Sequence, residues 1–411
     1  MSLRNTLATA LNTREGEGQP LVLLLIHSFL MGLTIVFYDT SASALFLHMF
    51  DATTLPYVYI GASIVLPCVG FLYSAIEERI TLSRLFTGTL LFVIASIVLF
   101  RGLLETTDSK WPVMVVFLWL EVVTVLMSLE FWGLAGQIFN VRQGKRLFGL
   151  IGAGEVTAGM LAGVSAGFVV AHIGTQNLLL CSAVSLGVSV VILRRIISAY
   201  PDALRKAAED EREEETAESS GAKSLLKERY ILLILALSAI SVLGFYFVDF
   251  AFYAQADARY GSSEQLARFF GFFFALSGFL NLIFQGFISG RLLSRYGVKI
   301  GLLALPAALM FGSGLVSIAG TFMAGTTTVF WLIVMTKLFD DVVRPTTEEP
   351  SILILYQPLP GRQRIGAQIL AEGVVEPVGM GIAGGMLLVL TRLFAFSAVH
   401  AAYVMIVIII L

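Results

Sequence analysis

The sequence predicts an all-α polytopic membrane protein with twelve transmembrane helices, arranged as two pseudo-symmetric bundles of six. The first observation is composition: 57% of the 411 residues are hydrophobic, only 14% are charged, and the mean hydropathy is +0.85. Soluble globular proteins carry about 25% charged residues. The second observation is a succession of long apolar stretches, and the third is a highly charged tract near the middle of the chain. Together they indicate a chain surrounded by lipid and built in two halves.

The apolar stretches are long enough to cross a bilayer, which takes about 20 predominantly apolar residues. In the first half, spans are expected near residues 20–48, 54–77, 83–103, 111–140, 145–172 and 176–197. In the second half, they are expected near residues 230–256, 265–290, 297–319, 324–349, 362–390 and 394–411. The two bundles therefore cover residues 20–197 and 229–411.

Two polar segments lie outside these bundles. Residues 198–228 contain the sequence EDEREEETAESS, which is too polar to pack or to cross the membrane, so a solvated cytoplasmic linker is expected. Residues 1–19 carry Leu3, Leu7 and Leu11 at intervals of four, which predicts an amphipathic N-terminal segment on the membrane surface.

The distribution of lysine and arginine predicts the orientation in the membrane. With the N-terminus in the cytoplasm, most of the 27 lysines and arginines fall on the cytoplasmic side. Lys337 lies within a span, and the opposite side receives only Arg101, Lys110, Arg259, Arg268 and Arg392. The positive-inside rule therefore favours a cytoplasmic N-terminus.

The two halves repeat one another. The stretch from Phe131 to Gly167, in which a basic turn joins two apolar segments, has a degraded copy from Gln357 to Gly385. Asp39 and Asp249 take equivalent positions in the first and seventh spans. Two six-helix repeats around a midplane site are the plan of the major facilitator fold, and such halves suit a carrier that rocks about a shared site better than a channel.

The repeated turns are candidates for an inner gate. Gly144 corresponds to Gly361 and Glu155 to Glu372, with 217 residues between the members of each pair. The glutamates could form ion pairs when the inner mouth closes, or they could make ordinary contacts at helix ends. The loop GRLLSRYGVK at residues 290–299 is similar to a loop motif of the major facilitator fold. The candidate gating residues are Gly144, Lys145, Arg146, Glu155, Arg291, Arg295, Gly361, Arg362 and Glu372.

Other classes of function receive no support from the sequence. The net charge of −2 argues against a nucleic-acid partner. No metal-ligand spacing, nucleophile motif or phosphate loop is visible, so we predict no enzyme activity, metal site or cofactor. The four histidines are scattered and are expected at helix ends or in the core.

Acidic residues within the spans are the best candidates for a binding site, because charges inside a membrane are costly and usually face a cavity or a partner. Asp39 and Asp249 would lie across the pseudo-two-fold axis and bind a solute or a coupling ion; the alternative is that each caps or pairs with a neighbouring helix. Glu121 and Glu130 lie nine residues apart, which places them on opposite faces of one helix. We favour Glu121 for the site and a structural role for Glu130.

The tenth span carries both signs of charge. Lys337 and Asp341, like Asp340 and Arg344, are spaced i,i+4, so the group could neutralise itself along one helix. The alternative is that Lys337 is a cation of the central cavity. Glycines elsewhere, at Gly159, Gly163, Gly167, Gly381 and Gly385, form small-residue faces that we assign to helix packing.

The segment FWGLAGQIFNVRQGKRLFGLIGAG resembles the ATP/ADP translocase (nucleotide transport protein) family of plastids and intracellular bacteria. That family has a Phe-Trp-Gly entering a loop, a basic pair, then aromatic and glycine residues. The resemblance continues through Asp39-Thr40, Val248-Asp249 and Pro345-Thr346-Thr347-Glu348. It implies a major facilitator-like fold and nucleotide transport in a bacterial cytoplasmic membrane.

Two departures from this family narrow the expectation. The family has lysines, thought to meet nucleotide phosphates, where this chain has Ser41 and Thr347. A polyphosphate in a low-dielectric cavity needs compensating cations, so ATP-for-ADP exchange is not implied. A nucleoside, a less charged nucleotide or an unrelated solute remains compatible with the site.

We therefore predict a secondary-active transporter of a nucleotide or related anionic metabolite that works by alternating access in the lipid bilayer. Tyr38 and Trp132 are candidates for stacking on a base. The alternatives are a transport-inactive receptor that controls an appended cytoplasmic domain beyond Leu411, and a proton-coupled facilitator of other specificity. The predicted substrate-binding residues are Tyr38, Asp39, Ser41, Glu121, Trp132, Asp249, Lys337, Asp341, Arg344, Thr347 and Glu348.

Overall fold

The computed structural model describes residues 17–77, 79–107, 109–139, 141–201, 225, 228–322, 326–359, 361–394 and 396–410. The side chains of residues 141, 142, 144–146, 361, 362 and 365 lie outside this description, as do most of the predicted N-terminal segment and linker. The described residues are almost entirely helical. Nine helical segments among them are long and apolar enough to cross a membrane, as the composition predicts.

The first half consists of long uninterrupted helices that follow the predicted spans closely. Short 3₁₀ turns at Ala52–Thr54 and Thr175–Asn177 precede the second and sixth of them. The helices are α2 (Gly18–Met49), α3 (Leu55–Glu77), α4 (Leu82–Thr106), α5 (Trp111–Ile138), α6 (Val141–Ile173) and α7 (Leu178–Ala199).

The second half contains the same succession of segments but with several irregular turns. Its helices are α10 (Arg229–Arg259), α11 (Ser263–Ile283), α12 (Gly290–Phe322), α13 (Thr327–Val343), α14 (Glu349–Leu355), α15 (Gly361–Leu370), α16 (Glu376–Leu393) and α17 (Ala398–Ile410). Turns of π-helix at Phe284–Ser289, Arg344–Glu348 and Ala371–Val375 join α11 to α12, α13 to α14 and α15 to α16.

Gly297 divides the longest helical run into the eighth and ninth predicted spans. Its φ of 77° lies in the left-handed region, which glycine adopts without strain. The tenth span extends to Leu355, beyond the predicted end at residue 349, because the helix continues through the π-helical turn at Arg344–Glu348. The arrangement is consistent with twelve spans, the α13–α14 run and α17 being the shorter ones.

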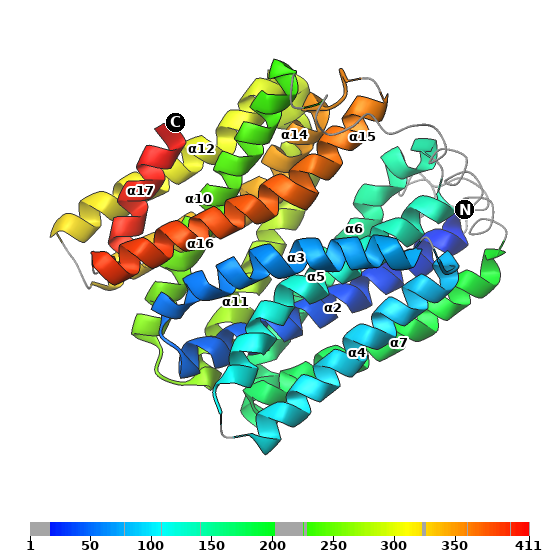
Figure 1. The fold of residues 1–411 in the computed structure, drawn as a ribbon, viewed down its shortest axis with the longest axis horizontal. Coiled ribbons are helices and arrows are strands. Elements are labelled where there is room, and N and C mark those ends of the chain that lie inside the picture. The colour runs from blue at the N-terminus through cyan, green and yellow to red at the C-terminus, as the bar shows by residue number, and fades with distance from the viewer. Residues whose placement is uncertain are drawn as a thin grey trace, which may run out of the picture.

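The two halves form two groups of helices, at the upper left and lower right of Figure 1. They meet mainly where α6 packs against α11 and α3 against α16. Gly163 makes the first contact possible, because a Cβ there would lie only 2.7 Å from the Ala275 nitrogen. In the second contact Gly381 faces Ser63, whereas Gly385 has open space beside it. The packing role predicted for the glycines is thus confirmed for Gly163 and Gly381.

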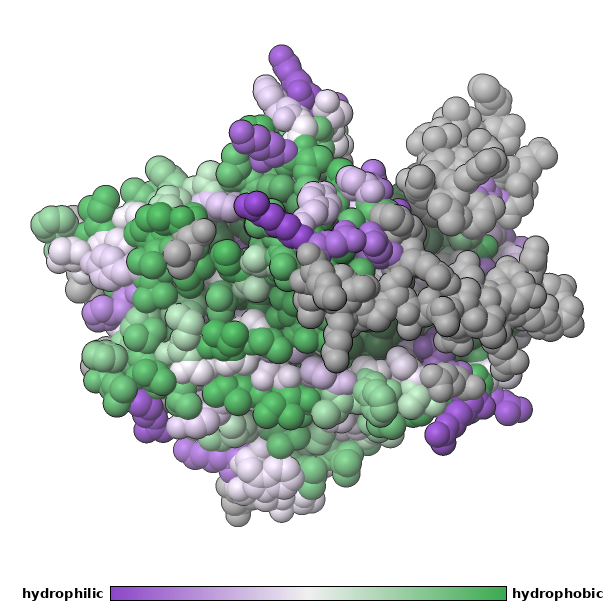
Figure 2. All heavy atoms as spheres, turned by 45° about the horizontal axis from the view of Figure 1, so that its top comes forward, coloured by the Kyte–Doolittle hydropathy of each residue, from purple (hydrophilic) through white to green (hydrophobic). Residues whose placement is uncertain are grey.

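The outer surface is apolar, as expected for a chain in lipid. Figure 2 shows hydrophobic side chains over most of the visible face. Large apolar residues such as Phe71, Val164 and Phe322 are 78%, 71% and 80% exposed. Soluble monomers rarely expose apolar surface on this scale, so the chain is a multi-pass membrane protein.

Candidate functional site

Lys337 of α13 lies at the centre of a buried group of charges. Its ammonium is 3.0 Å from Asp249 Oδ1 of α10, 3.2 Å from Asp341 Oδ1 and 3.9 Å from Asp340 Oδ2. The ring of Phe245 faces the same ammonium, 4.2 Å away. Charges inside a membrane are costly unless they are paired. One buried ammonium is therefore neutralised by carboxylates from two helices.

Arg344 extends this group by one helical turn. Its guanidinium lies 2.6 Å from Asp340 Oδ1 and 3.1 Å from Glu348 Oε2, and it donates a hydrogen bond to Ser241 Oγ of α10 at 2.5 Å. The Phe245 ring lies 5.2 Å from the guanidinium, so the ring contacts both cations.

The π-helical turn at Arg344–Glu348 positions the lower part of the group. Pro345 has no backbone N–H and cannot make a regular helical hydrogen bond, which a wider turn accommodates. Turns of this kind inside helices are frequent at functional sites. The turn keeps Arg344 and Glu348 within ion-pair distance.

Both i,i+4 pairs predicted for the tenth span are present. Lys337 contacts Asp341, and Arg344 contacts Asp340. The group is nevertheless not confined to one helix, because Asp249 from α10 makes the shortest contact with Lys337. The two interpretations of these charges are therefore compatible: the helix pairs its own charges and also presents them to its neighbours.

Two carboxylates of the first half face this group. Asp39 of α2 accepts a hydrogen bond from Ser43 Oγ at 2.6 Å. Glu121 of α5 has no hydrogen bond or ion pair with any described residue, and it lies within electrostatic range of Asp39, Asp249 and Lys337. We refer to the combined group as the central cluster. Its members are Asp39, Glu121, Asp249, Lys337, Asp340, Asp341, Arg344 and Glu348.

Tyr38 and Ser41, which were predicted at the solute site, are buried side chains of the first half in this structure. The Tyr38 ring is fully buried, and its hydroxyl donates to the Val116 carbonyl at 3.0 Å. Ser41 is also fully buried and donates to the Thr175 carbonyl at 2.9 Å. Successive residues of a helix point in different directions, so both side chains pack within the first half while Asp39 faces the second.

Trp132 and Thr347 were also predicted at the solute site, and neither is a member of the central cluster. Trp132 is about 16 Å along α5 from Glu121, and its ring packs against Phe131 and Phe148 with centroids 5.0 Å and 5.6 Å away. Thr347 is 2% exposed, which leaves it inside the packing of the π-helical turn. The assignment of these two side chains to the solute site stays a prediction.

Of the candidate gating residues, Glu155 lies within α6, where its backbone N–H donates to Ser28 Oγ of α2 at 3.0 Å. Glu155 and Glu372 are exposed and have no side-chain partner among the described residues. Arg291 donates to the Phe287 carbonyl, and Arg295 lies over the Tyr296 ring. The side chains of Gly144, Lys145, Arg146, Gly361 and Arg362 are outside the described part of the chain. The gate thus stays a prediction.

The two halves are bonded to each other at the opposite end of the bundle, which we call the closed end. The Ala52 N–H donates to Asp257 Oδ2 at 3.0 Å, and the Arg392 guanidinium donates to the Tyr57 hydroxyl at 3.0 Å. At the end that carries the N-terminus, no hydrogen bond or ion pair joins described residues of the two halves. Within the described residues, the hydrogen bonds that join the halves therefore lie toward the closed end.

Three hydroxyl side chains near the cluster were not predicted from the sequence. Tyr59 of α3 donates to Asp249 Oδ2 at 2.8 Å. Ser43 of α2 and Tyr253 of α10 form a hydrogen bond of 3.0 Å. Ser43 and Tyr253 each lie four residues after an aspartate of the repeat, Asp39 or Asp249, and this spacing could have identified them. Nothing in the sequence distinguishes Tyr59.

A second buried polar group lies wholly within the first half. His27 of α2 has Nε2 3.1 Å from Glu130 Oε2 and Nδ1 2.8 Å from Ser189 Oγ of α7. All three side chains are fully buried. This confirms a core position for His27 and a structural position for Glu130, on the face of α5 opposite Glu121.

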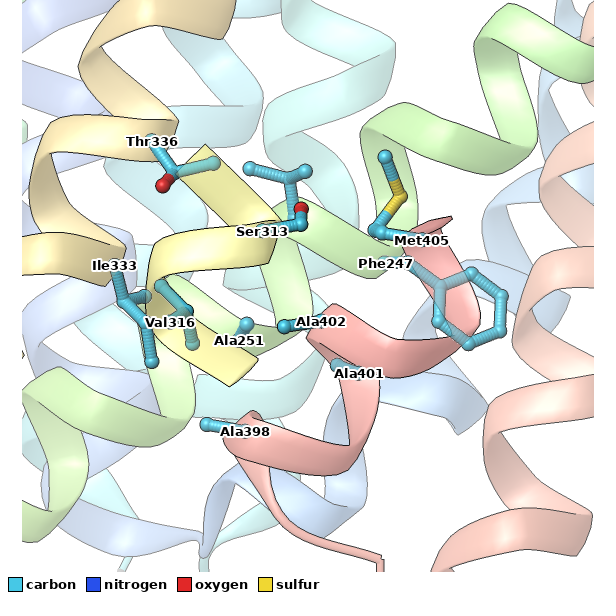
Figure 3. Close-up of a pocket in the computed structure, with 11 residues that line it drawn as sticks. Phe247, Ala251, Ser313, Val316, Ile333, Thr336, Ala398, Ala401, Ala402 and Met405 are labelled. Atoms are coloured by element: carbon cyan, nitrogen blue, oxygen red, sulfur yellow. The ribbon is translucent and has the colours of Figure 1, made fainter. Parts of the chain in front are cut away.

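A cavity within the second half offers no charge to a solute. It lies between α10, α12, α13 and α17 (Figure 3), and its only polar side chains are Ser313 and Thr336. Thr336 donates to the Leu332 carbonyl of its own helix at 2.8 Å. The charged side chains are therefore concentrated in the central cluster and not in this cavity.

Comparison with known proteins agrees with this architecture. The chain is 24% identical over 317 residues to ADP,ATP carrier protein 2 of Chlamydia trachomatis, covering 68% of this chain and 58% of that protein. It is 22% identical over 295 residues to ADP,ATP carrier protein 1 of the same organism, covering 64% and 55%. The chain thus spans little more than half the length of these relatives.

Solved structures with the same fold are transporters of the major facilitator type. A variant of the nucleoside transporter NupG matches with a TM-score of 0.67 and 14% identity over 95% of this chain and 96% of that one. The inward-open xylose transporter XylE from E. coli matches with a TM-score of 0.66 and 11% identity over 95% and 94%. The profile of the TLC ATP/ADP transporters matches residues 89–411, and the chain therefore belongs to the TLC ATP/ADP transporter family of membrane transporters.

Proposed function

We propose that this protein is a secondary transporter that moves a nucleoside, or a nucleotide with few phosphates, across the membrane by alternating access. The observation that carries the proposal is the charge balance of the central cluster. Lys337 and Arg344 are the two cations of the cluster, and each already contacts at least two carboxylates. The cluster has no free cation to offer a polyphosphate.

The balance of charges favours a solute of low charge. Asp39 and Glu121 have no cation within ion-pair distance among the described residues, so the cluster carries more carboxylates than cations. A nucleoside triphosphate would add further negative charge, which a low-dielectric site tolerates only with compensating cations. Ribose hydroxyls and base amino groups, by contrast, donate hydrogen bonds that carboxylates accept.

Alternating access is supported by the contacts between the halves. They are fastened at the closed end and share no described polar contact at the other. The close packing of α6 on α11 and of α3 on α16 repeats the same kind of contact on both sides of the pseudo-two-fold axis. In transporters built from repeats, such halves rock about a site between them.

Thermal stabilisation of the purified protein tests the choice of solute. A ligand that binds only the folded state stabilises it by about 2.7 kcal/mol at 100 times its Kd. We expect adenosine and AMP to raise the melting temperature, and ATP to have a smaller effect. Asp249→Asn should remove the response to adenosine. Stronger stabilisation by ATP than by adenosine would overturn the low-charge proposal.

Uptake into vesicles then tests transport itself. Accumulation of a stabilising solute, lost in Asp249→Asn, is the expected result. A solute that stabilises the protein yet is not taken up would instead indicate the receptor alternative. Uptake that depends on a pH gradient would indicate proton coupling through the carboxylates.

A further inference from the structure

Two hydrogen-bond chains cross between the halves at the level of the central cluster. In one, the Tyr59 hydroxyl of the first half donates to Asp249 Oδ2 of the second half at 2.8 Å. In the other, Ser43 bonds to Asp39 Oδ1 at 2.6 Å and to the Tyr253 hydroxyl of the second half at 3.0 Å. Each repeat aspartate is therefore linked to a tyrosine of the opposite half.

The positions of these groups follow the internal repeat. Asp39 and Asp249 are separated by 210 residues, and so are Ser43 and Tyr253. In each half the aspartate lies on the first helix, and the hydroxyl follows one helical turn nearer the closed end. Ser43 and Tyr253 therefore lie between the repeat aspartates and the hydrogen bonds at the closed end.

The surroundings of the two tyrosines hold these bonds away from solvent. Tyr59 is 4% exposed, and its ring lies 4.7 Å from that of Tyr246. Tyr253 is 8% exposed and packs against Phe117 of the first half, with ring centroids 5.8 Å apart. A buried donor that loses its acceptor is destabilised by its full desolvation, so each bond favours the arrangement in which the closed end is shut.

Asp249 belongs both to the central cluster and to one of the hydrogen-bond chains that join the halves. Its Oδ1 contacts Lys337, and its Oδ2 accepts from Tyr59. A solute that enters from the open side and donates a hydrogen bond to Asp249 competes with Tyr59 for Oδ2. Loss of that acceptor removes a cross-half bond without disturbing the ion pair with Lys337.

We infer that Tyr59 and Tyr253 are positioning residues that couple occupancy of the central carboxylates to opening of the closed end. The inference rests on the proposed function for the identity of the solute, which must be a hydrogen-bond donor such as a ribose hydroxyl or base amino group. In the absence of solute, the two tyrosines keep the halves together at the closed end. Binding at Asp249 releases Tyr59 and permits the halves to separate there.

Cysteine accessibility tests this inference. In a variant whose native Cys68 and Cys181 are replaced by serine, Ala52→Cys introduces a reporter at a closed-end position that is 4% exposed. The rate of its labelling by a membrane-impermeant maleimide measures opening. We expect Tyr59→Phe, and separately Tyr253→Phe, to raise this rate on the order of tenfold.

Tyr38→Phe is the matched control. It also removes a buried tyrosine hydrogen bond, of 3.0 Å to the Val116 carbonyl, but both partners belong to the first half. It should lower thermal stability without raising the labelling rate. Equal labelling of the Tyr38→Phe and Tyr59→Phe proteins, or no increase in a folded Tyr59→Phe protein, would overturn the inference.

A second arm with adenosine separates this inference from the proposed function. Adenosine should accelerate labelling of the reporter protein and should have no further effect in the Tyr59→Phe variant. If adenosine has no effect in any variant but Tyr59→Phe still accelerates labelling, the role of Tyr59 in keeping the closed end shut is supported and the solute proposal fails. If adenosine is transported but acts equally with and without Tyr59, the coupling role is wrong and the transport proposal stands.

Discussion

The fourth helix of the first half and its counterpart in the second half each bury a glutamate, but they pair it in different ways. Glu130 of α5 and Glu348 of the α13–α14 run are both buried glutamates near the end of the helix. Glu130 is paired with His27, inside a helix that runs without interruption. Glu348 is paired with Arg344, inside a π-helical turn that also holds Asp340 in the network.

This difference suggests a division of labour after duplication. Within the described residues, all π-helical turns lie in the second half, and so do both cations of the central cluster. The first half supplies only carboxylates and hydroxyls to the cluster. The first half therefore behaves as a regular frame, whereas the second half carries the groups that hold charge and the irregular turns that position them.

Removal of Lys337 should have the largest effect on stability, and it tests most directly whether the second half holds the charges of the central cluster. Lys337→Ala leaves Asp249, Asp340 and Asp341 without their shared ammonium, and breaking a buried ion pair costs about 3–5 kcal/mol. We expect a large fall in the melting temperature of the purified protein.

Because Lys337→Ala could fail to fold, Lys337→Met combined with Asp249→Asn and Asp341→Asn provides the companion variant. It removes two of the orphaned charges and should recover much of the lost stability. A Lys337→Ala protein that melts like the wild type would show that the cluster is solvated rather than held by its ion pairs.

Arg344→Lys should have the next largest effect. A single ammonium cannot replace a guanidinium that bonds Asp340, Glu348 and Ser241 at once. Loss of one charge-assisted hydrogen bond costs about 1.5–3 kcal/mol. Both the melting temperature and the binding of solute should change, since Asp340 also contacts Lys337. If the Arg344→Lys protein binds the solute with unchanged affinity, the contacts of Arg344 do not contribute to solute binding.

His27→Phe should destabilise the first half without altering the choice of solute. The change leaves Glu130 and Ser189 buried without their shared partner, at a cost of about 1–3 kcal/mol. Adenosine should still stabilise the variant by the same increment as the wild type. Glu130→Gln in the same background should restore part of the loss, because it replaces a buried charge with a neutral group. A changed preference among nucleosides would argue that His27 contributes to the site.

The fold was predictable because it depends on properties that a single chain displays. Long apolar stretches, a charged interruption and the positions of lysine and arginine require no knowledge of tertiary contacts. The irregular turns were not predictable in the same way. The tenth span was expected to end near residue 349, but the π-helical turn at Arg344–Glu348 lets the helix continue to Leu355.

The site was predictable only for its charges. An intramembrane Asp249 or Lys337 is recognisable because it is costly in lipid. The orientation of neighbouring side chains is not, which is why Tyr38 was expected at the site and lies in the core. Tyr59 reaches Asp249 only because the packing of the halves brings α3 close to α10. No local sequence pattern predicts that packing.

Neutralising Glu155 and Glu372 should have the smallest effect on stability. It also tests whether the two halves share one function at these equivalent positions. Both side chains are exposed and lack a side-chain partner in the described part of the chain, so Glu155→Gln and Glu372→Gln should leave the free energy of unfolding within about 0.5 kcal/mol of the wild type. If the two glutamates pair with the basic turns when their end of the bundle closes, each variant should nevertheless slow uptake several-fold.

Glu105→Gln is the control, because Glu105 is an exposed glutamate that pairs with Arg101 within α4 of the first half. Slower uptake in both gate variants but not in the control would mean that each repeat contributes one glutamate to the gate. Normal uptake in both would mean that these two carboxylates make no closing contact, which would then have to come from other side chains.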